Sequence, residues 1–181
     1  MKFNYKKSLK FVTLLITALL IATVSAAIYD YMYLNANVGV QGMSLEWVSG
    51  DDGTDAGTSI SGVTATLTNL KGPPNGTRIY ADPVRLNNTG GSSVTFDLTI
   101  DAITGDTGQL DSIYVKIYSL NTSSWIQNMT IWANGAQGSG ANNLQIPTGH
   151  LWRFQWEIKW KSTATTSHSV TVNLKLKVPV A

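Results

Sequence analysis

Two segments close to the C-terminus alternate apolar and polar side chains at every second position. In Leu151–Lys161 the apolar positions are Trp152, Phe154, Trp156, Ile158 and Trp160. In Ser169–Val178 they are Val170, Val172, Leu174, Leu176 and Val178. A period of two over this length is typical of a β-strand with one face on a core and the other in water. Both segments are therefore predicted to be strands, with Trp156 and Leu174 in the core.

Shorter segments with the same alternation fill most of the preceding chain, separated by turns rich in Gly, Pro, Asn and Asp. They are Gly39–Ser49, Ser61–Leu70, Thr77–Leu86, Ser92–Ile103, Ile113–Leu120 and Trp125–Ala133. Pro83 interrupts the third, which predicts an edge position because proline cannot donate to a strand ladder. Gly50–Thr58, Lys71–Gly76 and Gly135–Asn143 are predicted as loops. About eight or nine strands without a helical segment predict an all-β, jelly-roll-like β-sandwich.

The start of the chain has the parts of a secretory leader. Met1–Lys10 carries four lysines and no acidic residue, and Phe11–Ala27 contains no charge. Ala26 and Ala27 supply the small residues that a signal peptidase requires, so cleavage is expected after one or the other. Residues 1–27 are predicted to be a signal peptide and the remaining chain to be secreted to the cell surface. An uncleaved anchor is the alternative, although the apolar run falls short of the roughly 20 residues that span a bilayer.

The first segment after the leader, Ile28–Asn37, is apolar and aromatic although it directly follows the expected cleavage site. Alternate residues form two sets that would lie on opposite faces of a strand. One set is Tyr29, Tyr31 and Tyr33, and the other is Ile28, Met32 and Leu34, with Asp30 as the only charge of the segment. Two interpretations remain open. The segment is either the first strand of the domain's own sheet or an N-terminal arm that completes the sheet of another molecule.

Composition and charge narrow the class of protein. There is no cysteine, which excludes a disulfide framework and thiolate chemistry. The formal net charge is +2, but four of the lysines lie in the leader. Residues 28–150 contain 4 basic and 10 acidic residues, whereas residues 151–181 contain 5 basic and 1 acidic. This division fits either two faces of one domain or association between subunits, and no basic cluster is dense enough to predict nucleic-acid binding.

Side chains suited to catalysis or metal binding are few. The only histidines, His150 and His168, lie in predicted loops. The only glutamates, Glu46 and Glu157, lie in predicted strands. Neither a metalloprotease HExxH nor a G-x-S-x-G elbow occurs, so no enzyme activity and no cofactor are expected. The Asp51–Asp55 loop resembles part of a calcium loop but lacks the EF-hand ligand order, and a solvated turn is favoured.

Four Asn-X-Ser/Thr sequons occur, the acceptor pattern for N-linked glycans on secreted proteins. They begin at Asn75, Asn87, Asn121 and Asn128. The first three lie in or beside predicted turns, where a glycan is tolerated. Asn128 lies within a predicted strand and must point outward if it is modified.

The layout of the chain resembles that of the TasA/camelysin family, and more closely its archaeal relatives that form bundling pili. The features that carry the resemblance are the lysine-led leader, the small residues at its end, the aromatic segment Ala26–Tyr33 and a cysteine-free jelly roll. The resemblance implies that Ile28–Asn37 is a donor strand that leaves its own domain and fills a groove in the next subunit. It also implies a head-to-tail homopolymer, contacts between neighbouring filaments and a place in a biofilm matrix. The metallopeptidase label of some relatives is not carried over, because the residues for it are absent.

On this hypothesis the chain divides into a signal peptide over 1–27, a donor strand over 28–37 and a β-sandwich domain over 38–181. The alternative is a monomeric or membrane-anchored cell-surface module that binds a ligand such as a glycan through exposed tryptophans. The tryptophans not explained by a core face are Trp47, Trp125 and Trp132. For each of them a place in the core is nevertheless favoured. In both cases a membrane is involved only through an uncleaved leader.

Overall fold

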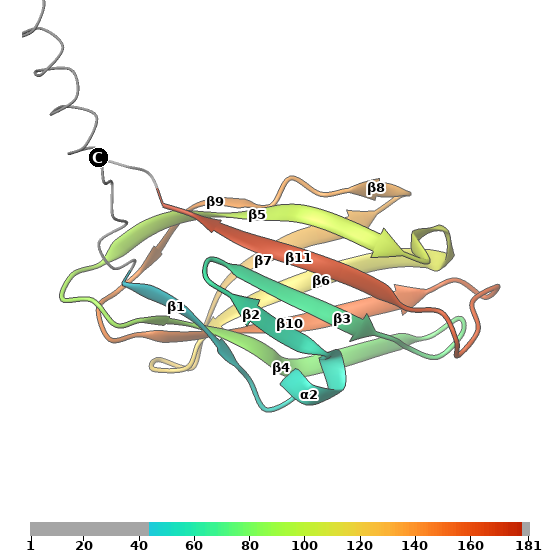
Figure 1. The fold of residues 1–181 in the computed structure, drawn as a ribbon, viewed down its shortest axis with the longest axis horizontal. Coiled ribbons are helices and arrows are strands. Elements are labelled where there is room, and N and C mark those ends of the chain that lie inside the picture. The colour runs from blue at the N-terminus through green and yellow to red at the C-terminus, as the bar shows by residue number, and fades with distance from the viewer. Residues whose placement is uncertain (1–43, 179–181) are drawn as a thin grey trace, which may run out of the picture. The chain divides into compact units, whose positions relative to one another are not determined.

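The computed structural model describes residues 44–178, which form two antiparallel β-sheets packed face to face (Figure 1). In spatial order, the first sheet consists of β1 (Leu45–Ser49), β4 (Thr77–Asn88), β10 (Leu151–Trp160), β6 (Leu110–Ser119), β7 (Ser124–Ala133) and β8 (Ala136–Gln137). The second consists of β2 (Thr58–Ser61), β3 (Thr64–Leu70), β11 (Val170–Lys177), β5 (Val94–Gly105) and β9 (Ala141–Ile146). A short helix, α2 (Gly53–Ala56), follows β1, and a 3₁₀ turn over Thr107–Gln109 precedes β6.

Eight of these strands follow the jelly-roll topology. β4, β10, β6 and β7 are neighbours in one sheet, and β3, β11, β5 and β9 are neighbours in the other. Within this set the chain passes to the opposite sheet at every connection except the β6–β7 hairpin, which is the path of a jelly roll. β1, β2 and β8 extend the sheet edges. The predicted jelly-roll-like sandwich is confirmed, with eleven strands in the described residues rather than eight or nine.

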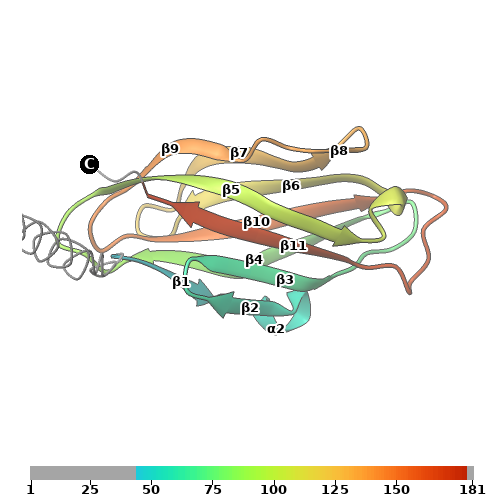
Figure 2. The same ribbon diagram turned by 45° about the horizontal axis from the view of Figure 1, so that its top comes forward.

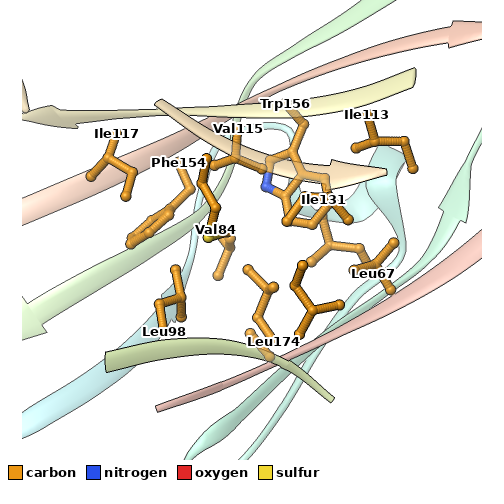
Figure 3. Packing of buried hydrophobic residues seen from close by; sticks show 14 of the residues in the cluster. Leu67, Val84, Leu98, Ile113, Val115, Ile117, Ile131, Phe154, Trp156 and Leu174 are labelled. Carbon is orange, nitrogen blue, oxygen red and sulfur yellow. The ribbon is translucent and has the colours of Figure 1, made fainter. Parts of the chain in front are cut away.

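The core lies between the sheets and is built from the inward-facing residues of both. All five apolar positions predicted for β10 are buried, and so are Val170, Val172, Leu174 and Leu176 of β11. Figure 3 shows Phe154 and Trp156 of the first sheet above Leu98 and Leu174 of the second. The alternation along these two strands therefore identified the buried face correctly.

The remaining tryptophans occupy three different environments. Trp47 is buried and donates its indole N–H to the carbonyl oxygen of Val63 at 2.9 Å. Trp132 is half-buried and packs against the core. The side chain of Trp125 is 58% exposed, so the prediction of a core position for this residue is wrong. The reason is a register shift in the β6–β7 pairing, where Ile126 is an extra residue that places Trp125 on the outer face.

Pro83 does not lie at a sheet edge, contrary to the sequence-based expectation. It is buried in β4, which has β1 on one side and β10 on the other. The β4–β10 register shifts between Phe154 and Trp156, so the proline lies at an irregularity where the ladder is interrupted. Its carbonyl oxygen accepts hydrogen bonds from the Gly50 N–H at 3.2 Å and the Thr58 hydroxyl at 2.9 Å.

Several short elements formed in segments predicted as loops. These are α2, the start of β2, β8 and the first residues of β9. In β9 the buried residues Ala141 and Leu144 are three positions apart, because the pairing with β5 shifts register and Asn143 has a positive φ of 54°. That spacing departs from the alternation of a regular strand, so the sequence pattern did not indicate a strand here. α2 is a single turn that ends at Gly57, whose φ of 65° suits glycine.

The burial on β11 gives a direct test of the face assignment. Replacing Leu174 with alanine is expected to lower the free energy of unfolding by about 2–5 kcal/mol, because the side chain is fully buried. Replacing the adjacent, exposed Lys175 with alanine should change it by no more than about 0.5 kcal/mol. Denaturant unfolding of the two variants measures both values. Equal losses would mean that the inward face is assigned wrongly.

The predicted signal peptide, its cleavage residues Ala26 and Ala27, and the arm Ile28–Asn37 lie outside the described residues. So does the part of the Gly39–Ser49 prediction that precedes Ser44. Within residues 44–178, no helix is both long enough and apolar enough to cross a membrane.

Candidate functional site

One side of the sandwich carries two strand edges that are largely unpaired within residues 44–178. β7 pairs with β6 along one edge, but on its other edge β8 pairs only with Trp132 and Ala133. β9 is an edge strand of the second sheet and pairs only with β5. Figure 2 shows β7, β8 and β9 along the same side of the sandwich. Such edges present rows of main-chain N–H and C=O groups to which another strand can bind.

A groove with a volume of about 380 Å³ lies between these two strands, and we call it the β7–β9 groove. It is lined by Ser119, Thr122, Ile126, Gln127, Asn143, Leu144, Gln145, Pro147, His150 and Trp152. Ile126 of β7, Leu144 of β9 and Trp152 of β10 make its interior apolar, so both sheets contribute. The volume is near the lower end of the roughly 300–1,000 Å³ typical of ligand pockets. It can therefore admit a few side chains rather than a whole segment.

The β9–β10 loop forms one end of the groove and is held by the buried side chain of Asn88. The Asn88 amide nitrogen donates to the carbonyl oxygens of Ser92 at 2.9 Å, Ile146 at 3.1 Å and Pro147 at 3.1 Å. Its oxygen accepts the N–H of Gly90 at 3.0 Å. One buried side chain thus connects the end of β4 to the loop that borders the groove.

Asn121, in the β6–β7 turn, holds the same loop from the other direction. Its side-chain oxygen accepts the N–H of Leu151 at 2.7 Å, and its amide nitrogen donates to the carbonyl oxygen of Gly149 at 3.3 Å. His150 lies between these two contacts and lines the groove. The loop is therefore positioned by side-chain hydrogen bonds from both of its flanks.

On the opposite side of the sandwich, where β1 and β2 are the edge strands of the two sheets, α2 lies beside β2 and β4 (Figure 1). We call this the closed side. α2 packs there with Ala56 fully buried. The Trp47–Val63 hydrogen bond joins β1 to the β2–β3 turn, and the Thr58–Pro83 hydrogen bond joins the two sheets. The two sides of the described part therefore differ. The β7–β9 groove lies between strand edges with few main-chain partners, whereas α2 and these hydrogen bonds bridge the β1 and β2 edges.

The carboxylates of the Asp51–Asp55 loop are engaged by the protein itself. Two of them form the ion pairs Asp51–Arg85 and Asp55–Arg78. The third, Asp52, accepts the N–H of Asp82 at 3.0 Å. No group of three side chains suited to holding a metal ion occurs within residues 44–178. The loop carboxylates therefore contribute to closing the β1–β2 side.

Asp82 is buried beneath this loop and is paired with Arg85. The Arg85 Nε–H donates to the carboxylate of Asp82 at 2.8 Å. This hydrogen bond raises the pKa of the Arg85 guanidinium, a group that is already protonated at neutral pH. A fixed positive charge thus compensates a carboxylate that would be costly to bury alone.

The division of charge along the sequence is partly neutralised inside this one domain. The ammonium of Lys159 lies 2.8 Å from the carboxylate of Asp111, and that of Lys116 lies 2.9 Å from the carboxylate of Glu157. These hydrogen bonds raise the pKa of both lysines. Both pairs join β10 to β6. Only the Lys159–Asp111 pair joins a base of the C-terminal region to an acid of the preceding region, because Glu157 is the one acidic residue of residues 151–181.

The structure does not bring the two histidines together. His150 precedes β10 at the groove, whereas His168 lies in the loop beyond the other end of β10. There the Nδ1 atom of His168 accepts the N–H of Thr165 at 2.8 Å. Glu46 lies on β1 and Glu157 on β10, and the latter is occupied by its ion pair with Lys116.

The four sequon asparagines lie in different settings. Asn75 is exposed in the turn before β4, with a positive φ of 52°. Asn87 is half-buried near the end of β4, and Asn121 is exposed in the β6–β7 turn. Asn128 is exposed on β7, so it has the outward orientation that its position in a strand required.

Residues 44–178 thus form an antiparallel jelly-roll sandwich with one closed side and one side that carries a groove between free strand edges. No protein-family model matches the chain, and no curated protein matches it. The resemblance to the TasA/camelysin family therefore remains a hypothesis that rests on the sequence pattern.

Proposed function

We propose that this protein is a structural subunit of a secreted, extracellular filament in which the arm Ile28–Asn37 of one subunit enters the β7–β9 groove of the next. The observation that carries the proposal is the groove, because it joins free strand edges to an apolar interior in a sandwich whose other side is closed. Proteins normally cover or blunt such edges. The alternating apolar arm supplies a cover of suitable chemistry.

A strand added to β7 or β9 would satisfy the main-chain groups along that edge. Every second side chain of the added strand would then point into the groove. Tyr29, Tyr31 and Tyr33 have that spacing on one face of the arm. The other face carries Ile28, Met32 and Leu34, with the charged Asp30 between the first two. A groove of about 380 Å³ takes a few such side chains, while the backbone lies along the strand edge.

This mode of contact determines the form of the assembly. The arm and the groove are different surfaces, so the contact is heterologous, and repeated heterologous contacts generate open filaments unless they close into a ring. The subunit is proposed to be structural, without catalysis and without a cofactor, and its partners are other copies of the same chain. This is the assembly that the resemblance to bundling pili implies.

The second candidate function is ligand binding by a monomeric or membrane-anchored cell-surface protein. The exposed indole of Trp125 favours this candidate, because aromatic side chains are common in the binding sites for sugars and other ligands. It predicts dispersed monomers at concentrations where the filament proposal predicts polymers.

Replacing Ile126 with arginine should abolish polymerisation of the mature protein while the domain stays folded. Ile126 is half-buried on the edge of β7 and lines the groove, where a charge would have to be buried against apolar side chains. Negative-stain electron microscopy detects the filaments, and circular dichroism checks the fold. The matched control is Ile60→Arg on β2 at the closed side, where the residue is 38% exposed; this variant should polymerise like the unmodified protein.

Deletion of Ile28–Asn37 extends the same test to the arm. The shortened protein should stay unpolymerised and should bind the Ile28–Asn37 peptide, whereas the shortened protein that also carries Ile126→Arg should not. Normal filaments from the deletion variant would contradict the proposal. An intact mature protein that stays monomeric at high concentration would contradict it too, and would favour the ligand-binding module.

A further inference from the structure

The outer face of β7 brings an exposed indole next to a sequon asparagine. The Nε1–H of Trp125 donates to the side-chain oxygen of Asn128 at 3.1 Å. Residues three positions apart in a regular strand point to opposite faces. Here the extra residue Ile126 in the β6–β7 pairing puts both on the outer face. The irregularity in β7 therefore builds this pair.

The geometry leaves the reactive atom of Asn128 accessible. Trp125 engages the side-chain oxygen, whereas the sugar of an N-linked glycan is attached to the amide nitrogen. That nitrogen makes no hydrogen bond to the residues of the described part. Thr130, the third residue of the sequon, is exposed on the same face of β7, since it lies two positions along the strand.

In two of the other sequons the asparagine side chain is less free to carry a glycan. Both polar atoms of the Asn121 side chain hold the β9–β10 loop, so a glycan on its nitrogen would disturb the contact with Gly149. Asn87 is half-buried in β4, between Glu46 of β1 and Leu151 of β10. Asn75 is exposed, but no aromatic side chain is hydrogen-bonded to it. Asn128 is thus the sequon that combines exposure with an adjacent aromatic surface.

We propose that Asn128 carries an N-linked glycan whose first sugar lies against the indole of Trp125. The proposal rests on the export that the proposed function requires, because the transfer takes place outside the cytoplasm. The glycan would come from a lipid-linked saccharide phosphate. The bond from sugar C1 to the phosphate oxygen breaks, C1 forms a bond to Nδ2 of Asn128, the lipid phosphate leaves with the electron pair, and one amide proton passes to a base of the transferase.

The attachment is compatible with the contacts present. The side-chain oxygen of Asn128 remains a carbonyl after glycosylation and still accepts the Trp125 N–H. The C–H face of a sugar ring can then cover the exposed indole and remove apolar surface from water. The proposed glycan would therefore explain why the polypeptide alone leaves the indole of Trp125 exposed on the outer face of β7.

The test uses protein collected from the surface of the cells that make it. Glycopeptide mass spectrometry should find a saccharide on the peptide with Asn128 and none on the peptide with Asn121. Thr130→Ala should remove the modification at Asn128, and the matched variant Thr130→Ser should keep it. Both substitutions leave Asn128 and Trp125 in place. Surface-exported protein with Asn128 unmodified would overturn the proposal.

The contact with Trp125 has its own measurement. The chain has six tryptophans, and all except Trp125 are buried or half-buried, so collisional quenching of tryptophan fluorescence reports mainly on this residue. Quenching should be weaker in the Thr130→Ser protein than in the Thr130→Ala protein, and Trp125→Phe should remove the difference. Equal quenching of the glycosylated and unglycosylated proteins would overturn the placement of the sugar. A glycosylated protein that forms no filaments would contradict the proposed function alone.

Discussion

Replacing Trp156 with alanine is expected to lower the free energy of unfolding by about 3–5 kcal/mol. The side chain has no exposed surface and lies on β10, paired with Tyr80 of β4 and Val115 of β6. Figure 3 shows it among side chains of both sheets, including Leu67 and Leu174. Alanine would leave a cavity at the centre of the core, where the surrounding strands cannot collapse to fill it.

Two further variants make this prediction specific, and denaturant unfolding measures all three. The Trp156 indole N–H has no hydrogen-bond partner among the described residues, so Trp156→Phe should cost clearly less than Trp156→Ala. Trp125→Ala removes the same side chain from an exposed site and should change stability by no more than about 0.5 kcal/mol. A similar loss at Trp125 and Trp156 would contradict the assignment of the core.

The second large effect is expected at Asn88, where alanine should lower the free energy of unfolding by at least about 2 kcal/mol. The side chain is fully buried and makes hydrogen bonds to four main-chain groups. Alanine removes all of these at once and leaves the carbonyl oxygen of the buried Ile146 without this hydrogen bond. Thermal or denaturant unfolding gives the size of the loss.

The effect of Asn88→Ala should extend to the groove, because the loop that Asn88 holds forms one of its ends. Binding of the Ile28–Asn37 peptide to the shortened domain should weaken in this variant, which isothermal titration calorimetry can follow. Asn142→Ala is the control for the loss of stability, since Asn142 is an exposed asparagine on β9. If Asn88→Ala lowered the free energy of unfolding no more than Asn142→Ala, the hydrogen bonds of the Asn88 side chain would contribute little to stability.

The sequence predicted those parts of the fold in which one pattern dominates. β10 and β11 were identified with their buried faces because a strict alternation of apolar and polar residues continues over each whole strand. The first three residues of β9 were assigned to a loop because Asn142 and Asn143 interrupt its buried positions. Pro83 was placed at an edge because a local rule for strands does not foresee an irregularity that depends on a distant partner strand.

The sequence predicted less of the candidate site than of the fold. The free edges of β7 and β9 exist because of the order of strands in two sheets, which no local pattern specifies. Asn88 was missed because a buried asparagine and an exposed one look alike in a polar turn. The outward orientation required of Asn128 could be stated from the strand pattern, but its contact with Trp125 depends on the extra residue in β7.

The position of the last two strands has a consequence for how the chain folds. β10 lies between β4 and β6, and β11 lies between β3 and β5, so an interior place in each sheet is filled by a strand late in chain order. Leu174 pairs with Ala65, which lies 109 positions earlier in the sequence, and such non-local pairs slow folding. Neither sheet can close until β10 and β11 have been synthesised. For a chain proposed to leave the cytoplasm, this order delays the completion of both sheets until nearly the whole chain has been made.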